Sequence, residues 1–112
     1  METSVVIAAL SALAHPGRLA IYRLLVAVGG VGSAAGEIAN SVGAPANTTS
    51  TNLGILQTAG LITSRREGRH VRYWTDHEAM RNLLGYLIED CCGGRPEICA
   101  PLIGARARVP VC

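Results

Sequence analysis

The 112-residue chain contains no lysine and no phenylalanine, and it has no long apolar run. All ten of its basic residues are arginines, whose forked guanidinium groups suit phosphate or carboxylate oxygens. No stretch reaches the roughly 18 consecutive apolar residues of a membrane span, and the chain does not open on a basic segment followed by an apolar one. We therefore expect one small cytoplasmic domain with a modest core and no membrane partner.

The distribution of charge is more informative than its sum. The net charge is only +2, which does not by itself predict a nucleic-acid partner. However, Arg65, Arg66, Arg69 and Arg72 lie within eight residues and face a single acid, Glu67. Such a basic patch is typical of a surface that binds phosphate.

Apolar spacing divides the first sixty residues into short helices. Four helices are expected, over residues 4–14, 16–28, 34–42 and 45–59. Ser33 can cap the third helix and Gly43 can end it. Because the first turns of the fourth helix are almost wholly polar, the pattern predicts a helix-turn-helix over residues 34–59.

Two β-compatible runs and one further helix complete the pattern. The runs cover residues 61–66 and 70–75, and Gly68 between them can adopt the positive φ that a tight hairpin needs. Asp76 then caps a last helix. The apolar stripe of this helix, which must be buried against something, consists of Met80, Leu83, Leu84, Leu87 and Ile88. The expected fold is mainly α with a small β-hairpin, a winged helix-turn-helix of order ααααββα.

All four cysteines follow the last helix, and three of them form a cluster. Cys91, Cys92 and Cys99 lie within nine residues, with Gly93-Gly94 as a hinge between them. In a reducing compartment, such a cluster favours metal or thiol chemistry over a disulfide framework. As(III) and Sb(III) are soft ions that suit three thiolates, whereas structural zinc takes four ligands. The cluster therefore predicts a trivalent metalloid site, with Cys112 as either a fourth ligand or an incidental thiol.

Three segments and the order of elements carry a resemblance to a known family. The segments are residues 12–19 (ALAHPGRL), 56–62 (LQTAGLI) and 65–69 (RREGR). Over about residues 5–92 the chain resembles the ArsR/SmtB family of metalloregulatory repressors. The resemblance implies a homodimer held by the first and last helices, which binds operator DNA until a metalloid binds. The Cys-Cys-Gly-Gly ending resembles the arsenite-responsive branch, whose ligands follow the last helix.

Two other ligand sites of the family are not expected. Where one branch carries Cys-Val-Cys in the third helix, this chain has Ala34-Ala35-Gly36. Where another binds zinc along the last helix, Asp76 and His77 open the helix, but no histidine follows at its far end.

Short polar side chains at the start of the fourth helix are free to approach base edges and phosphates. Those that match the family's recognition positions are Asn47, Thr48, Ser50, Thr51 and Asn52. At the hairpin tip, Arg66, Arg69 and His70 are expected to contact phosphate or the minor groove. The alternative is that the first set only caps and solvates a helix and that the second is ordinary solvated surface. A symmetric dimer would place two recognition helices about 34 Å apart, which predicts an inverted-repeat operator.

We divide the chain into a DNA-binding and dimerisation domain, residues 1–92, and a tail with the metalloid ligands, residues 93–112. The predicted function is a repressor that As(III), Sb(III) or a methylated trivalent arsenical releases from DNA, with no catalytic residue and no organic cofactor. A thiol redox sensor, or a zinc- or cadmium-sensing repressor of the same fold, is the alternative. A small thiol exchange enzyme or metal carrier is disfavoured, because the chain has no Cys-x-x-Cys and no His or acid clearly paired with a thiol.

Overall fold

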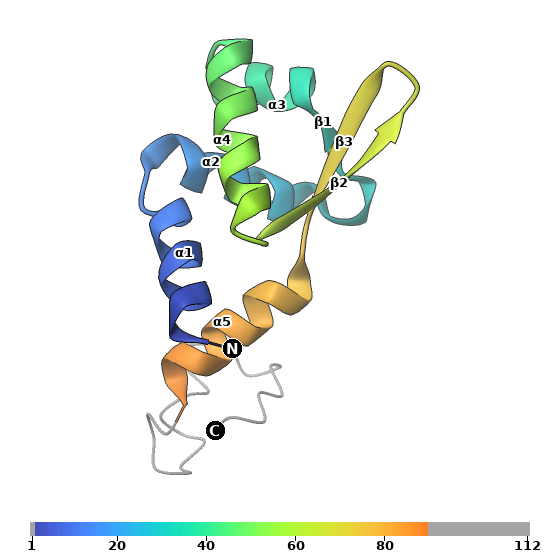
Figure 1. Cartoon of the computed structure of the whole chain (residues 1–112). Helices are drawn as coiled ribbons and strands as arrows, with labels where there is room; N and C mark the ends of the chain where they lie inside the picture. Colours follow the sequence, from blue (N-terminus) through green and yellow to red (C-terminus); the bar gives the residue numbers. More distant parts are fainter. Residues whose placement is uncertain (1, 90–112) are drawn as a thin grey trace.

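The computed structural model describes residues 2–89 and confirms a winged helix-turn-helix (Figure 1). Its α-helices are α1 (Thr3–Leu13), α2 (Pro16–Val28), α3 (Ala35–Val42), α4 (Ala46–Thr58) and α5 (His77–Ile88). A 3-10 turn, η1 (Gly29–Val31), and the strands β1 (Ser33–Ala34), β2 (Ile62–Glu67) and β3 (His70–Thr75) complete it. The expected boundary between residues 1–92 and 93–112 lies outside the described residues and stays a prediction.

Local capping chemistry sets several helix ends where the sequence predicts them. His15 Nδ1 accepts the backbone N–H of Gly17 at 3.0 Å, directly before the first turn of α2. Asp76 Oδ1 likewise accepts the N–H of Ala79 at 3.0 Å and starts α5. At the other end of α3, Gly43 adopts the left-handed conformation with φ 69°. These caps satisfy backbone groups that a helix end leaves without partners.

The sheet has three strands in the described residues, one more than the hairpin predicted from the sequence. β1 pairs antiparallel with β3 in the register Ser33↔Tyr73 and Ala34↔Arg72, and the strand order is β1-β3-β2. Ser33 is therefore a strand residue, and its predicted role as the cap of α3 is wrong. Instead, the Glu37 carboxylate accepts the N–H of Ala34 at 2.9 Å. A two-residue strand is too short to show the alternation that predicts strands from sequence.

The core lies around α2, which packs against α1, α3, α4 and β3. Leu25 of α2 is completely buried, and the other large side chains that are almost wholly buried are Ile21, Ile38, Leu53, Leu56, Leu61 and Leu83. Burial of each such side chain contributes about 1.5 to 3 kcal/mol to folding. These residues come from α2, α3, α4, α5 and the position directly before β2. One core therefore fixes α4 relative to the β2–β3 hairpin, which we call the wing.

No helix in the described part of the chain is by itself long and apolar enough to cross a bilayer. Thr3–Leu13 and Pro16–Val31 pass that test only as a pair, which bends by 97° at the break.

Gly32 joins η1 to β1 at a place where only glycine fits. Its φ is +68°, and a Cβ built there would lie 2.6 Å from Trp74 Nε1 and 2.8 Å from the Tyr73 carbonyl oxygen. The Trp74 indole in turn donates a hydrogen bond of 2.9 Å to the Gly30 carbonyl. The close approach of this loop to β3 therefore depends on the missing side chain.

We expect Gly32→Ala to lower the free energy of unfolding by at least about 2 kcal/mol, because positive φ and steric overlap add. Gly30→Ala is the matched control: a Cβ at Gly30 meets nothing within 4 Å and its φ is not positive. Urea unfolding followed by far-UV circular dichroism measures both. Equal stability of the two variants would contradict the role assigned to Gly32.

Candidate nucleic-acid interface

The start of α4 presents a polar, solvent-exposed face. Asn47, Thr48, Ser50 and Thr51, four of the predicted DNA-contacting residues, are exposed. Asn47 Oδ1 accepts the N–H of Thr48 at 2.9 Å, and Thr51 Oγ1 donates to the Asn47 carbonyl at 3.1 Å. These local bonds hold the side chains close to the helix, while hydroxyl and amide groups stay open to a groove.

Asn52 lies on a different face from the other four. Only 7% of it is exposed, and its Oδ1 lies 3.4 Å from Arg18 Nη1. With Thr49, Leu53 and Leu56 it forms a buried stripe at the spacing i, i+3, i+4, i+7. A base contact by Asn52 therefore has no support from its position, and its observed partner is Arg18 of α2.

Ile55 is the exception among the large apolar residues of α4. Leu53 and Leu56 are completely buried, whereas Ile55 is 38% exposed. Extending the stripe from Leu53 and Leu56 one turn toward the N-terminus would have found Thr49 and Asn52. The polarity of these two residues concealed the helical period.

The hairpin tip carries the other predicted contacts. Arg66, Arg69 and His70 are all exposed, and Gly68 has the positive φ, 63°, expected for this turn. Within the part of the chain that the structure describes, neither Arg66 nor Arg69 forms an ion pair or a side-chain hydrogen bond. Both guanidinium groups can therefore meet phosphate without breaking an existing contact.

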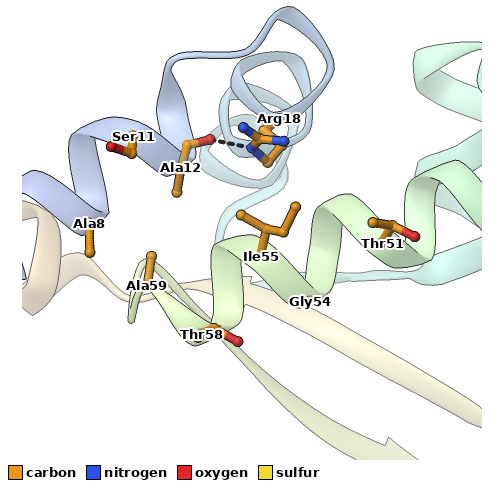
Figure 2. A pocket seen from close by; sticks show the side chains of 9 residues that line it. All are labelled: Ala8, Ser11, Ala12, Arg18, Thr51, Gly54, Ile55, Thr58 and Ala59. Carbon is orange, nitrogen blue, oxygen red and sulfur yellow. Dashed lines mark hydrogen bonds between the residues drawn. The ribbon is translucent and has the colours of Figure 1, made fainter.

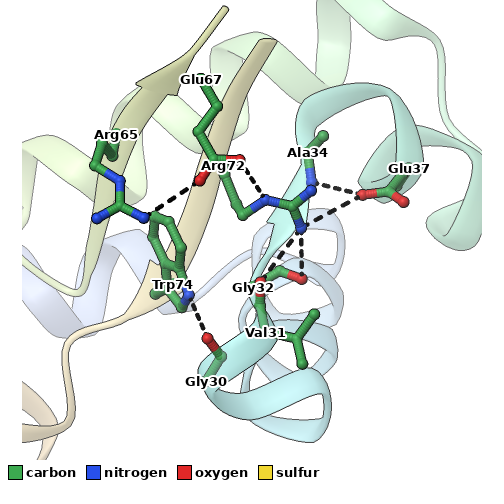
Figure 3. A network of polar contacts seen from close by, with 9 residues as sticks. All are labelled: Gly30, Val31, Gly32, Ala34, Glu37, Arg65, Glu67, Arg72 and Trp74. Atoms are coloured by element: carbon green, nitrogen blue, oxygen red, sulfur yellow. Dashed lines mark hydrogen bonds and ion pairs between the residues drawn. The ribbon is translucent and has the colours of Figure 1, made fainter.

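Arg65 and Arg72, the other two arginines of the patch, are held by Glu67 (Figure 3). Arg72 Nε lies 2.9 Å from one carboxylate oxygen and Arg65 Nη2 lies 3.3 Å from the other. Arg72 Nη1 also donates to the carbonyls of Val31 and Gly32, each at 3.3 Å. Arg72 thus ties the wing to the loop before β1.

The Arg72 hydrogen bond, followed by the Arg65 bond, lowers the pKa of Glu67 below its ordinary value. Glu67 is therefore ionised at neutral pH and keeps its charge into moderate acid. A carboxyl group whose pKa is lowered by folding stabilises the folded state at pH values above its ordinary pKa. This stabilisation is lost as the pH falls through the lowered pKa. The Arg65 guanidinium also lies 5.2 Å from the centre of the Trp74 ring, within cation–π range.

Figure 1 shows how these parts face outward. The N-terminal end of α4 and the tip of the β2–β3 hairpin lie toward one end of the molecule, at the top of the view, and α5 lies toward the other. A helix end and a β-hairpin that lie toward the same end of the molecule are the elements with which winged helices contact DNA.

The predicted thiol ligands Cys91, Cys92 and Cys99, and the candidate Cys112, lie outside the described residues. Within residues 2–89, no group of three or more His, Cys, Asp or Glu side chains could hold a metal ion. Asp76 caps α5 instead, as its hydrogen bond to Ala79 shows.

Comparison with known proteins identifies the family to which this chain belongs. A family model described as a helix-turn-helix domain matches residues 13–65. The HTH-type transcriptional regulator YgaV of Escherichia coli K12 is 34% identical over 85 residues, which cover 76% of this chain and 84% of that protein. The homodimeric winged helix-turn-helix DNA-binding domain Mb0332 of Mycobacterium bovis, described as a possible ArsR-family regulator, is 32% identical with a TM-score of 0.64 over 76% of this chain and 77% of that one. The chain belongs to the ArsR/SmtB family.

Membership of the ArsR/SmtB family establishes the general function. The chain is a transcriptional regulator with a DNA-binding winged helix-turn-helix, and not an enzyme. The transcriptional repressor BigR of Xylella fastidiosa is also similar, with 26% identity and a TM-score of 0.59 over 78% of this chain and 85% of that one. The family predicted from the sequence is thus confirmed, whereas its arsenite-responsive branch and the cysteine ligands stay predictions.

The exposed tip arginines give a quantitative prediction about salt. Arg66→Ala and Arg69→Ala should each weaken DNA binding, and because a dimer has two wings, each should lower the slope of log K against log salt by about 2. Arg23→Ala, which removes an exposed arginine from α2, is the matched control and should leave the slope unchanged. Fluorescence anisotropy with a labelled promoter fragment at several salt concentrations measures this. An unchanged slope in a variant that carries both Arg66→Ala and Arg69→Ala would exclude the wing from the interface.

Proposed function

We propose that this ArsR/SmtB-family regulator is a metalloid-responsive repressor. It binds an inverted-repeat operator as a homodimer and releases it when As(III), Sb(III) or a methylated trivalent arsenical binds Cys91, Cys92 and Cys99. The observation that carries the proposal is the cluster of three thiols directly after α5, the last helix of a winged helix-turn-helix. The cytoplasm is the proposed location, because the mechanism needs reduced thiols.

On the DNA side, the proposal assigns base edges to the exposed face of α4 and phosphates to the wing. The α4 residues are Asn47, Thr48, Ser50 and Thr51, and the wing residues are Arg66, Arg69 and His70. Asn52 is instead assigned the role of holding α4 against Arg18 of α2, because its side chain is buried there. The similar protein BigR is a transcriptional repressor, which supports repression as the direction of control.

An exposed apolar face on α1 and α5 supports the proposed dimer interface. The exposed large side chains of this face are Val5, Ile7, Leu10, Leu84, Tyr86 and Leu87. Thr3 Oγ1 and Tyr86 Oη share a hydrogen bond of 2.9 Å, so the start of α1 lies against the end of α5. Exposed apolar side chains on two neighbouring helices favour an interface, and a twofold axis would let two copies cover each other.

Thiol chemistry supports the choice of inducer. As(III) and Sb(III) are thiophilic, and three cysteines supply the trigonal set of soft ligands that they prefer. Binding of As(OH)3 would form three As–S bonds and break three As–O bonds, and the three thiol protons would leave with the three hydroxyl groups as water. Cys91 follows Ile88, the last residue of α5, after only Glu89 and Asp90. Ligation there would act on the helix that carries Leu84 and Leu87 of the proposed interface.

The proposed coupling is mechanical. A change at the end of α5 would alter how two copies pack, and therefore the separation of their two α4 helices. A coupling free energy of about 1 to 3 kcal/mol corresponds to a 5- to 150-fold loss of DNA affinity, which suffices for induction.

The cysteine assignment is tested by arsenite-induced release of operator DNA from the reduced protein. Wild type should release, whereas Cys92→Ser and Cys99→Ser should stay bound, because two thiolates hold the metalloid far less tightly than three. Cys112→Ser is the matched control and should release like wild type. Release from Cys92→Ser and Cys99→Ser at the arsenite concentrations that release wild type would contradict the proposed metalloid site. Release of wild type by a thiol oxidant alone would favour the redox alternative.

The dimer face is tested separately. Leu84 and Leu19 are equally exposed, at 45% and 44%, but Leu84 lies on α5 and Leu19 on α2. We expect Leu84→Glu to dissociate the dimer, because it buries a charge in the interface, and Leu19→Glu to leave it intact. Sedimentation velocity at micromolar protein distinguishes these outcomes. A dimeric Leu84→Glu protein would place the interface elsewhere.

A further inference from the structure

A cavity of about 530 Å³ lies between α1 and α4, beside Arg18 of α2 (Figure 2). Ala8 and Ala12 form its α1 wall, and Gly54 and Ile55 form much of its α4 wall. Its volume is in the range of small-molecule sites, about 300 to 1,000 Å³. Among the described residues, neither the wing nor the apolar side chains of α5 line it.

The cavity exists because both helices present small side chains to each other. Ala8 and Ala12 are one helical turn apart on α1, and Gly54 opposes them without a side chain. Ile55 stays 38% exposed beside this gap, which explains why an isoleucine in the middle of α4 is not packed. Most of the lining residues are exposed, so the site is open to solvent, and an apolar ligand in it would gain dispersion contacts with the small side chains of both walls.

Arg18 gives the cavity a definite polarity. It is the one charged residue among the described residues that line it, and Ser11, Thr51 and Thr58 add hydroxyl groups. Arg18 Nε donates to the Ala12 carbonyl at 2.6 Å, and Nη1 lies 3.4 Å from Asn52 Oδ1. A guanidinium has five N–H donors, so these two bonds leave donors for a ligand. In Figure 2 the guanidinium lies at the edge of the cavity near Ile55.

We propose that this cavity is a second regulatory site, which binds a small organic acid through its carboxylate and a short apolar chain. The forked guanidinium of Arg18 matches the two oxygens of a carboxylate, and the hydroxyl groups can add single hydrogen bonds. The alanine, glycine and isoleucine walls accept the apolar chain. Inorganic phosphate has the charge but no apolar part, so it should bind poorly.

The cavity is lined by α1, which belongs to the proposed dimer interface, and by α4, which carries proposed DNA-binding residues. Through its bonds to Ala12 and Asn52, Arg18 connects the end of α1 to the buried face of α4. Thr51 lines the cavity and also lies on the exposed DNA-facing turn, where it bonds to Asn47. A carboxylate that recruits Arg18 would weaken this connection and shift α4 relative to α1. This regulatory step rests on the proposed function of the chain as a repressor, whereas binding itself does not.

The binding test uses hexanoate as the probe, with hexanol and inorganic phosphate as controls, and the full-length protein without DNA. Gly54→Leu should fill the cavity, since a Cβ at Gly54 meets nothing within 4 Å and leucine favours a helix. Gly36→Leu is the matched control, on a helix outside this cavity and with equally open space around its Cβ. Ala8→Leu blocks the opposite wall and serves if Gly54→Leu does not fold.

Titration by calorimetry and by amide chemical shifts measures the outcome. We expect hexanoate to bind wild type and Gly36→Leu equally, and to bind the two blocking variants at least about tenfold more weakly, or 1.4 kcal/mol. Hexanol and phosphate should bind less tightly than hexanoate. Equal binding of hexanoate and hexanol, or binding that survives both blocking variants, would overturn the site.

Operator affinity with and without saturating hexanoate then tests regulation. We expect a change of at least about fivefold in wild type and Gly36→Leu and no change in Gly54→Leu. If hexanoate binds but operator affinity stays constant, the regulatory step is wrong. If wild type binds no operator at all, the proposed function fails while the calorimetric result for the cavity stands.

Discussion

The arrangement of this molecule depends on the burial of α2 against α1, α3, α4 and β3. Leu25 and Ile21 are in the middle of this packing, and both are almost wholly buried. Because the recognition helix and the wing both rest on α2, their relative position is a property of the core and not of the flexible side chains that would meet DNA. Close-packed protein interiors move between discrete arrangements and do not deform continuously. A regulator built this way can transmit a change at one helix to the spacing of another.

The wing shows how few of its charges are available for a partner. From the sequence, four arginines form one basic patch, but Glu67 holds two of them and Arg72 is also bonded to the loop before β1. Of the pair that remains, Arg66 lies near the end of β2 and Arg69 lies in the turn. The held arginines stiffen the hairpin, which reduces the conformational entropy that DNA binding would otherwise have to remove. One acid in a basic patch thus divides it into a structural part and a part that faces solvent.

Much of the fold could be predicted because its signals are local. His15, Gly43, Gly68 and Asp76 each act on neighbouring backbone, and the helix and hairpin ends follow from them. β1 could not be predicted, because two residues form a strand only when β3 is beside them. The burial of Asn52 was equally hidden, since its partner Arg18 is 34 positions away in the sequence. For the predicted DNA surface, residue type and spacing selected the first turns of α4 but not which side of the helix faces solvent. The thiol cluster is visible in the sequence alone, and its role rests on chemistry and on family membership.

Trp74 has a consequence for how this protein can be observed. It is the only tryptophan in the chain, it lies in the wing beneath the Arg65 guanidinium, and its indole is bonded to the loop after α2. A nearby cation and a hydrogen bond to the ring nitrogen both shift indole emission. The unmodified protein therefore contains its own optical reporter in the wing, and excitation of that single tryptophan reads the surroundings of the wing without any label.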